Sequence, residues 1–294
     1  MEPLEPNAED CCNSGCNPCI FDIYEQQLKA FRKKKFNGDN LNVIQNGISQ
    51  WKYTEFVVVK NFPVCDFHNC VTFKRIDQDD TTVWWKPGDH FLLKYSSNQN
   101  SCTRAYTPIK VKNELSEDYD FSIFAKKYDC GLVSTYLCNL KEGDTTLWRG
   151  PYGHYKMEPN KYDRIIMIAQ GTGIAPFITI IDEILNDEDN MTKIRLLYCC
   201  KCENSILFRD TLYAFKSYWN FTYDIFLSTS CTSNFKCKYQ EPIKQHRLNK
   251  EYLFKLKPFL QNDQVLICGA PTFIEAYKTH LEGEILNKEN IIMF

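Results

Sequence analysis

The sequence predicts a β-barrel followed by an α/β unit with a parallel sheet, and a small cysteine-rich helical module in front of both. Three observations lead to this fold class. Four cysteines crowd into residues 11–19, short β-rich runs broken by Gly, Pro and Asn fill residues 53–158, and apolar runs alternate with helical stretches from residue 161 onward. Short strands at close spacing are typical of antiparallel barrels, and strands separated by helices are typical of parallel sheets.

The amino-terminal module is expected to cover residues 1–40. Its segment "IFDIYEQQLKAFRKKKF" has apolar residues at helical spacing, and the basic residues at its end suit a helix C-terminus. The run "RKKK" at 32–35 is better explained as a solvated helix end than as a docking site for an acidic redox partner.

The candidate metal ligands are Cys11, Cys12, Cys16 and Cys19. Thiolates this close in sequence can converge on a metal, but four sulfurs from one short loop are sterically tight, so zinc, an iron–sulfur cluster and plain reduced cysteines all stay open.

The barrel is expected over residues 50–158, and its most distinctive stretch is "RAYTPI" at 104–109. Arg104 can grip a phosphate with two parallel bonds, Tyr106 offers a flat face and a hydroxyl, and Thr107 offers a short hydroxyl donor. Taken alone, a surface arginine beside a core tyrosine is the more ordinary interpretation. The stretch "CGLVSTYL" at 130–137 favours phosphate binding, because Gly131 and the amides that open a helix could hold a second phosphate.

The α/β unit is expected over residues 159–294, with "QGTGIAP" directly after its first strand. Gly171 and Gly173 would let a pyrophosphate approach the backbone, and Pro176 suits a first helical turn. Alone, this spacing fits an ordinary strand-to-helix turn equally well. A second strand ends in "LICGAP", which would put Cys268 at the same edge of the sheet, although a cysteine there is commonly just a small buried hydrophobe.

Composition excludes several classes. A formal net charge of −2 gives no electrostatic basis for nucleic-acid binding, and no apolar run approaches the roughly 20 residues that span a bilayer. No signal peptide is visible, so the 15 cysteines are expected to be reduced in a soluble, intracellular and cytoplasmic protein without a transmembrane segment. The sequence gives no indication of the oligomeric state.

Four motifs in order resemble the ferredoxin reductase superfamily, and most closely the NADH–cytochrome b5 reductases. They are Arg-x-Tyr-Thr at 104–107, Gly-x-x-Ser at 131–134, Gly-Thr-Gly-x-x-Pro at 171–176 and Cys-Gly-x-Pro at 268–271. The resemblance covers roughly residues 50–294. In addition, "CCNSGCNPCIFDIYEQQL" is similar to the oxidoreductase-like N-terminal domain found before the reductase in related proteins. The resemblance implies an antiparallel FAD-binding barrel followed by a parallel-sheet nicotinamide-nucleotide lobe.

The resemblance also implies roles for individual residues. FAD would be bound by Arg104, Tyr106, Thr107 and Pro108, and its pyrophosphate by Gly131, Leu132, Val133 and Ser134. The nicotinamide nucleotide would be bound by Gly171, Thr172, Gly173 and Pro176, with Cys268, Gly269 and Pro271 beside the nicotinamide ring. Thr107 and Cys268 would align and tune the reacting groups rather than act as acid or base.

The implied function is transfer of a hydride from NADH to FAD and then of single electrons to a haem protein such as cytochrome b5. NADPH is not excluded, because Lys238 aligns where NADH-specific relatives have aspartate. Two alternatives stay open. One delivers electrons to a metal or thiol acceptor through the amino-terminal cysteines, and the other is a cofactor-free scaffold that binds partners.

Overall fold

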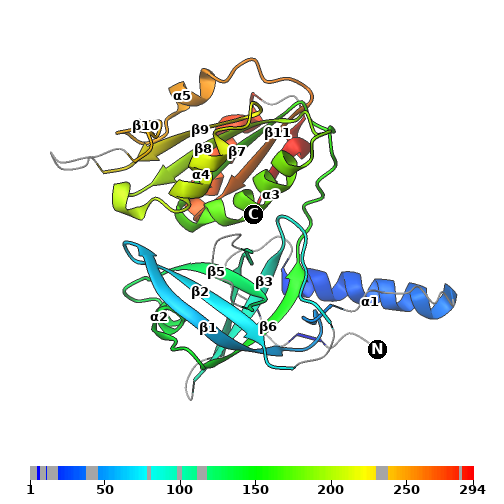
Figure 1. The fold of residues 1–294 in the computed structure, drawn as a ribbon. Coiled ribbons are helices and arrows are strands. Elements are labelled where there is room, and N and C mark those ends of the chain that lie inside the picture. The colour runs from blue at the N-terminus through cyan, green and yellow to red at the C-terminus, as the bar shows by residue number, and fades with distance from the viewer. Residues whose placement is uncertain are drawn as a thin grey trace. The chain divides into compact units, whose positions relative to one another are not determined.

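The computed structural model describes residues 5–6, 11, 19–37, 46–77, 81–97, 101–110, 118–229, 238–284 and 287–294, without the side chains of residues 30 and 33–37. Contacts between residues divide the chain into two compact units. The first unit holds Met1–Pro63 and His68–His154, and the second holds Val64–Phe67 and Tyr155–Phe294. Figure 1 shows the elements of both units, which are described one at a time.

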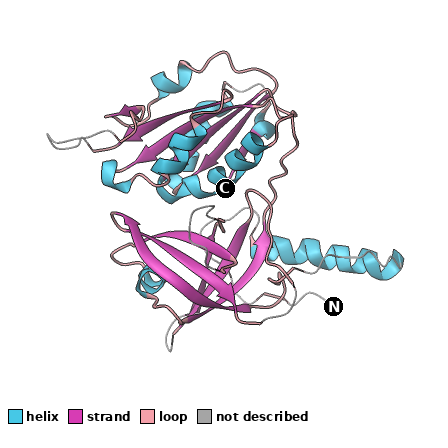
Figure 2. Cartoon of the chain, in the orientation of Figure 1, coloured by secondary structure: helices cyan, strands magenta, loops and turns pink. Residues whose placement is uncertain are grey.

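The first unit contains a six-stranded antiparallel sheet in the order β4-β3-β6-β1-β2-β5 (Figure 2). Its strands are β1 (Thr54–Cys65), β2 (His68–Arg75), β3 (His90–Ser96), β4 (Ser101–Tyr106), β5 (Phe121–Lys126) and β6 (Thr145–Tyr152). An isolated bridge between Ile109 and Ser122 joins the chain after β4 to β5, so that the two edge strands of the sheet meet. The predicted antiparallel barrel is therefore confirmed.

The barrel is filled by aromatic side chains. The ring of Phe121 lies 5.0–5.3 Å from the rings of Phe56, Phe73, Phe91 and Trp148, mostly edge to face. Such contacts add to the large apolar area that each ring buries. Helix α2 (Leu132–Asn139) packs on this core through Val133 and Leu137, which fixes the position of its first turn.

The predicted amino-terminal helix is confirmed as α1 (Ile20–Asn37), which belongs to the first unit. Asp22 lies in its first turn and accepts a hydrogen bond of 2.9 Å from the backbone amide of Cys19. Ile20 and Ile23 pack against Leu92 and Tyr152 of the barrel. Among the described helices, none is both long enough and apolar enough to cross a bilayer.

The second unit contains a six-stranded parallel sheet in the order β10-β9-β8-β7-β11-β12. Its strands are β7 (Arg164–Gln170), β8 (Lys193–Cys200), β9 (Phe221–Leu227), β10 (Ile243–Lys244), β11 (Asp263–Cys268) and β12 (Ile291–Met293). Chain order runs outward from β7 through β8 and β9, then resumes with β11 on the other side of β7. This reversal creates the kind of switch point at which α/β sheets bind ligands, beyond the carboxyl ends of the strands.

Helices flank this parallel sheet. They are α3 (Ala175–Asn186), α4 (Arg209–Phe215), α5 (Lys250–Phe254) and α6 (Pro271–Glu282), with short 3₁₀ turns η2 (Gly171–Ile174), η3 (Glu203–Ser205) and η4 (Lys288–Asn290). Leu253 of α5 and Leu281 of α6 share one apolar cluster with Ile166 and Ile168 of β7. The predicted parallel sheet with crossover helices is confirmed.

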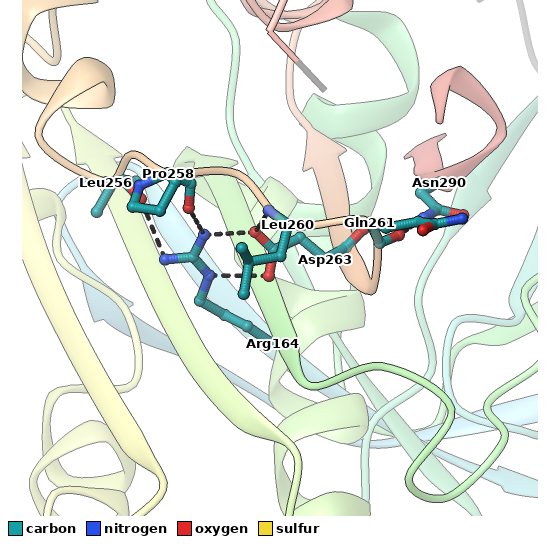
Figure 3. A network of polar contacts seen from close by, with 7 residues as sticks. All are labelled: Arg164, Leu256, Pro258, Leu260, Gln261, Asp263 and Asn290. Atoms are coloured by element: carbon teal, nitrogen blue, oxygen red, sulfur yellow. Dashed lines mark hydrogen bonds and ion pairs between the residues drawn. The ribbon is translucent and has the colours of Figure 1, made fainter. Parts of the chain in front are cut away.

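An ion pair joins the amino ends of the neighbouring strands β7 and β11 (Figure 3). Arg164 at the start of β7 donates from Nε to Asp263 Oδ1 at 3.1 Å and from Nη2 to Asp263 Oδ2, and Asp263 starts β11. The remaining guanidinium bonds reach the carbonyls of Leu256 at 3.1 Å and Pro258 at 3.0 Å. Because a buried charge is tolerated only when it is paired and hydrogen-bonded, this network fixes the register of β7 against β11 and therefore aligns their carboxyl ends.

Candidate functional site

Strand β4 supplies the first part of a candidate site in the barrel unit. Arg104 and Tyr106 lie opposite Leu93 and Phe91 of β3, and both are half-buried. Arg104 Nη1 donates to the carbonyl oxygen of Thr103 at 2.8 Å. Burial raises the pKa of the Tyr106 hydroxyl well above its ordinary value, so this hydroxyl stays protonated and can donate a hydrogen bond. Thr107 is half-buried directly after the strand, and Pro108 is buried.

The first turn of α2 supplies the second part. Gly131 precedes the helix, and a Cβ added to it would lie 2.3 Å from Ser134 Oγ, so a larger residue there would displace the Ser134 side chain. Ser134 Oγ donates to the Gly131 carbonyl at 3.1 Å and accepts from the Tyr128 amide at 3.2 Å. Since no side chain of the described residues caps α2, the amides of Leu132 and Val133 are left to bind an anion.

The two parts lie close together. Tyr106 packs against the same barrel core that contains Val133 and Leu137 of α2. Leu132 is 54% exposed, whereas Val133 and Ser134 are buried and hold the turn in place. The barrel therefore brings the predicted residues of its two motifs into one region.

A pocket of about 530 Å³ runs along α2 from this turn. It is lined at one end by Gly131 and Leu132, and further along by Tyr95, Tyr136 and Asp144. The rings of Tyr95 and Tyr136 lie 5.1 Å apart. The volume lies within the range of pockets that bind small molecules and cofactors. No sequence motif identified Tyr95 or Asp144, which are far from α2 in the chain and of common types, and Tyr136 lies in the stretch "CGLVSTYL" but was given no role.

In the second unit, the turn after β7 is built around Gly173. A Cβ on this residue would lie 2.5 Å from the carbonyl oxygen of Cys268 and 2.8 Å from its carbonyl carbon, so only glycine fits. Gly171 has a φ of +55°, in the left-handed region that glycine tolerates, and nothing lies within 4 Å of its added Cβ. Thr172 is half-buried in η2, and Pro176 lies buried in the first turn of α3.

The turn after β11 lies directly beside this one. Cys268 pairs with Ala169 in the sheet, and a Cβ on Gly269 would lie 2.8 Å from Gln170 Cβ. Gln170 Oε1 accepts a hydrogen bond of 3.1 Å from the Ala270 amide, which joins the two turns. Pro271 opens α6. The bridging role of Gln170 was missed in the sequence, where a glutamine at a strand end carries no signal.

Cys268 is a neutral thiol in this setting. Burial raises its pKa to about 12, so that the thiolate is scarce near neutral pH. Thiolates, not thiols, act as nucleophiles. The residue can therefore contribute shape and packing at the edge of the sheet, and not covalent chemistry.

Lys238 is already paired in the structure. Its Nζ lies 2.7 Å from Asp210 Oδ1 in the first turn of α4, and this bond raises the pKa of Lys238. The neighbouring Tyr239 ring stacks on Tyr213 at 4.5 Å. Both segments follow the carboxyl ends of β8 and β9. The cation that the sequence placed near the coenzyme ribose is thus balanced by a carboxylate 28 residues away in the chain.

Only part of the predicted metal site can be described. Cys11 Sγ and Cys19 Sγ lie 3.9 Å apart and are both half-buried, whereas Cys12 and Cys16 lie outside the described residues. Within the part of the chain that the structure describes, no group of three or more His, Cys, Asp or Glu residues is placed to share a metal. Zinc or iron–sulfur binding therefore stays a prediction.

Comparisons with known proteins agree with this division of the chain. Residues 56–157 match the family model described as "Oxidoreductase FAD-binding domain", and residues 167–279 match "Oxidoreductase NAD-binding domain". Residues 1–38 match "Oxidoreductase-like protein, N-terminal". These matches cover the barrel, the parallel sheet and the cysteine-rich segment in turn.

Relatives that match most or all of the chain are named as cytochrome b5 reductases or reductase-like proteins. The chain is 29% identical to a mouse NADH-cytochrome b5 reductase-like protein over 100% of this chain and 95% of the mouse protein. It is 31% identical to NADH-cytochrome b5 reductase 1 of Laccaria bicolor over 86% of this chain and 79% of that protein. Its fold is similar to the cytochrome b5 reductase domain of Ulva prolifera nitrate reductase, with a TM-score of 0.71 at 23% identity over 85% of this chain and 100% of that domain.

The residues in both units fit the nucleotides that these domains bind. An uncapped helix N-terminus and an arginine in the same unit suit the diphosphate of FAD. Two tightly apposed glycine turns at the switch point of a parallel sheet suit a second dinucleotide. Gly131 and Gly173 allow close packing against Ser134 and Cys268, whereas an added Cβ at Gly171 would meet nothing within 4 Å, so the backbone of Gly171 is open to a phosphate.

Proposed function

Because the chain belongs to the NADH–cytochrome b5 reductase family and is an NAD(P)H-dependent flavoprotein reductase, we propose that it oxidises NADH and reduces a haem protein such as cytochrome b5. FAD, when bound, supplies the chemistry that converts a hydride into two single electrons. The protein's own contribution is to bind and orient the two nucleotides and to hold hydroxyl donors at fixed positions.

The observation that supports this proposal best is that each unit has a glycine turn at which a helix begins, where a phosphate could bind. One combines Arg104 with the uncapped turn at Gly131, and the other is the Gly173 turn held against Cys268. An ordinary strand-to-helix turn needs no glycine whose Cβ would strike a neighbouring carbonyl. The Gly173 turn carries that constraint, whereas an added Cβ at Gly131 would meet the Ser134 hydroxyl oxygen and one at Gly171 would meet nothing within 4 Å.

We assign roles to the predicted residues on this basis. In the barrel, Arg104 and the α2 turn at Gly131–Ser134 bind the FAD diphosphate, while Tyr106, Thr107 and Pro108 line the flavin. In the parallel sheet, Gly171, Thr172, Gly173 and Pro176 bind the nicotinamide nucleotide, and Cys268, Gly269 and Pro271 form the adjoining turn. No side chain acts as a nucleophile, in accord with the raised pKa of Cys268.

NADH is the proposed coenzyme rather than NADPH. The additional 2′-phosphate of NADPH would need an unpaired cation near the ribose. Lys238 is the candidate cation, and Asp210 Oδ1 binds its ammonium group at 2.7 Å. A carboxylate in that position would repel a phosphate and would itself accept hydrogen bonds from ribose hydroxyls.

The test begins with the absorbance spectrum of the purified full chain. The proposal expects bound FAD, bleaching on addition of NADH, and reduction of added cytochrome b5. Arg104→Ala removes a charge-assisted phosphate contact of about 1.5–3 kcal/mol, so FAD should bind roughly 10- to 150-fold more weakly. Arg247→Ala, which removes an exposed arginine of the second unit, is the matched control and should retain FAD.

Each outcome separates the proposal from an alternative. A colourless protein that does not take up FAD would favour the partner-binding scaffold. A different result would favour delivery of electrons to a metal or thiol acceptor. In that case NADH would reduce the flavin but not cytochrome b5, and electron transfer to the metal or thiol acceptor would be lost when Cys11, Cys12, Cys16 and Cys19 become serine. Metal analysis of the same preparation tests the predicted zinc or iron–sulfur site.

A further inference from the structure

Cys11 and Cys19 face each other at the start of α1. Their sulfur atoms lie 3.9 Å apart, in van der Waals contact, and both thiols are free and half-buried. A disulfide bond is about 2.05 Å long, so the two sulfurs would have to approach by about 1.9 Å to form one. Rotation of two cysteine side chains supplies a movement of that size without moving the helix.

The backbone of Cys19 is firmly held. Its amide donates to Asp22 Oδ2 at 2.9 Å, and its carbonyl oxygen accepts from the Ile23 amide at 3.0 Å. Cys19 is therefore the residue that opens α1, and the side chain that reaches Cys11 starts from a fixed point.

The barrel surface holds the thiol pair, Cys11 and Cys19, in contact. Both cysteines pack, together with Ile20, against Leu92 of β3 and Tyr152 of β6. Leu92 is 4% exposed and Tyr152 is 3% exposed, so this contact is closely packed. The two sulfurs meet because each lies against the same apolar patch of the barrel.

Further bonds keep α1 on that patch. Gln27 Nε2 donates to Gln50 Oε1 at 3.1 Å, and the hydroxyl of Tyr152 donates to the Gln50 carbonyl at 2.5 Å. The helix that carries Cys19 is thus bonded to the same segment as the tyrosine on which the cysteines lie. The thiol pair is a feature of the folded first unit and not of a free tail.

Two neighbouring sulfurs satisfy the requirement of a disulfide, whereas a structural zinc site needs further ligands. Tetrahedral zinc takes four protein ligands. Among the described residues, no third His, Cys, Asp or Glu joins Cys11 and Cys19 as a shared ligand. Both cysteines pack on apolar side chains, and a disulfide is neutral, so its formation leaves no charge to be solvated at that contact.

We propose that Cys11 and Cys19 form a reversible dithiol–disulfide site that is oxidised by peroxides. One thiolate attacks a peroxide oxygen and becomes a sulfenic acid as water or an alcohol leaves, and the second thiol then displaces water to form the S–S bond. With hydrogen peroxide, two thiols and one H₂O₂ give one disulfide and two waters, so two electrons pass from sulfur to oxygen. Two equivalents of a small thiol reverse the step by exchange. This site is independent of the proposed reductase activity.

The test uses the full chain, reduced and freed of reductant and then treated with hydrogen peroxide. Free thiols are blocked with N-ethylmaleimide, the protein is reduced again, and newly freed thiols are labelled with heavy N-ethylmaleimide before mass spectrometry. We expect heavy label on Cys11 and Cys19 together, and its loss from both when either is changed to serine. Treatment with glutathione before blocking should remove the heavy label.

Two matched variants complete the experiment. Cys130→Ser removes an exposed thiol elsewhere in the barrel unit and should leave the Cys11–Cys19 bond unchanged. The double variant Cys12→Ser, Cys16→Ser removes the other cysteines of the segment and should also retain the bond. The proposal is overturned if Cys11 and Cys19 stay reactive to maleimide at peroxide doses that oxidise Cys130, if they pair with Cys12 or Cys16 instead, or if a stoichiometric bound metal protects them.

Discussion

Replacement of Gly173 by alanine is the sharpest test of the turn after β7. The added Cβ would lie 2.5 Å from the Cys268 carbonyl oxygen, whereas ordinary van der Waals contact begins at 3.4 Å. The turn and β11 would therefore have to separate by about 0.9 Å. The three atoms nearest to the added Cβ all belong to the backbone of Cys268 and Gly269, so no side-chain rotation can relieve the clash.

The expected cost follows from this displacement. Overpacking of a rigid interior typically costs about 1–3 kcal/mol. If the whole cost appears in coenzyme binding, the affinity for NADH falls roughly fivefold to more than a hundredfold. If the turn relaxes before the coenzyme arrives, part of the cost appears instead as a lower free energy of unfolding.

Two measurements on the same variant capture both contributions. Urea unfolding gives the loss of stability, and titration with NADH gives the loss of affinity. Gly283→Ala is the matched control, because φ there is −83° and nothing lies within 4 Å of the added Cβ. The reasoning fails if Gly173→Ala unfolds and binds NADH as the control does.

Two further predictions concern charge. Asp210→Asn leaves Lys238 without its carboxylate partner, so the ratio of kcat/KM for NADPH to kcat/KM for NADH should rise. An exposed charge pair contributes roughly 1 kcal/mol, which corresponds to a rise of about fivefold. Lys238→Gln in the same protein should abolish the gain. An unchanged ratio would mean that this pair lies away from the ribose. The second prediction concerns His90. Burial lowers the pKa of its imidazole to about 4, and the charge of His154 adds to this effect. Between about pH 6.5 and pH 4 the unfolded chain therefore binds a proton that the folded chain excludes. The free energy of unfolding should therefore fall as pH falls through that window, and less so in His90→Gln; parallel pH profiles for the two proteins would refute the assignment. Comparison with this variant separates the imidazole from the neighbouring carboxyl of Asp89, whose pKa burial raises.

Long regular elements were predictable from the sequence because their periodicity is local. The four parallel strands β7, β8, β9 and β11 were each visible as apolar runs, since a strand covered on both faces buries nearly every residue. The two-residue β10 and three-residue β12 were missed, because runs of that length carry no period. Strand β4 was noticed for its chemistry and not for its strand pattern, since its six residues are mostly polar.

The candidate site was predictable only where a motif is continuous in the chain. The turn at Gly171–Pro176 and the turn at Cys268–Pro271 were both identified, but their direct contact through Gly173 depends on the sheet register. The pairing of Lys238 with Asp210 could not be foreseen for the same reason. A lysine and an aspartate 28 residues apart give no signal until α4 and the segment after β9 are folded beside each other.

Strand β3 gives the amino-terminal module a structural role within the barrel. Leu92 pairs with Ala105, and Ala105 lies inside the stretch proposed to bind the flavin. The side chain of Leu92 also packs against α1 and the two cysteines. A shortened protein that begins after α1 would bare Leu92 and Tyr152 to water on the reverse side of that stretch. The module thus covers an apolar part of the barrel surface. Its removal would change the packing around β3, and therefore the strand that pairs with the cofactor motif, although no residue of that motif had been changed.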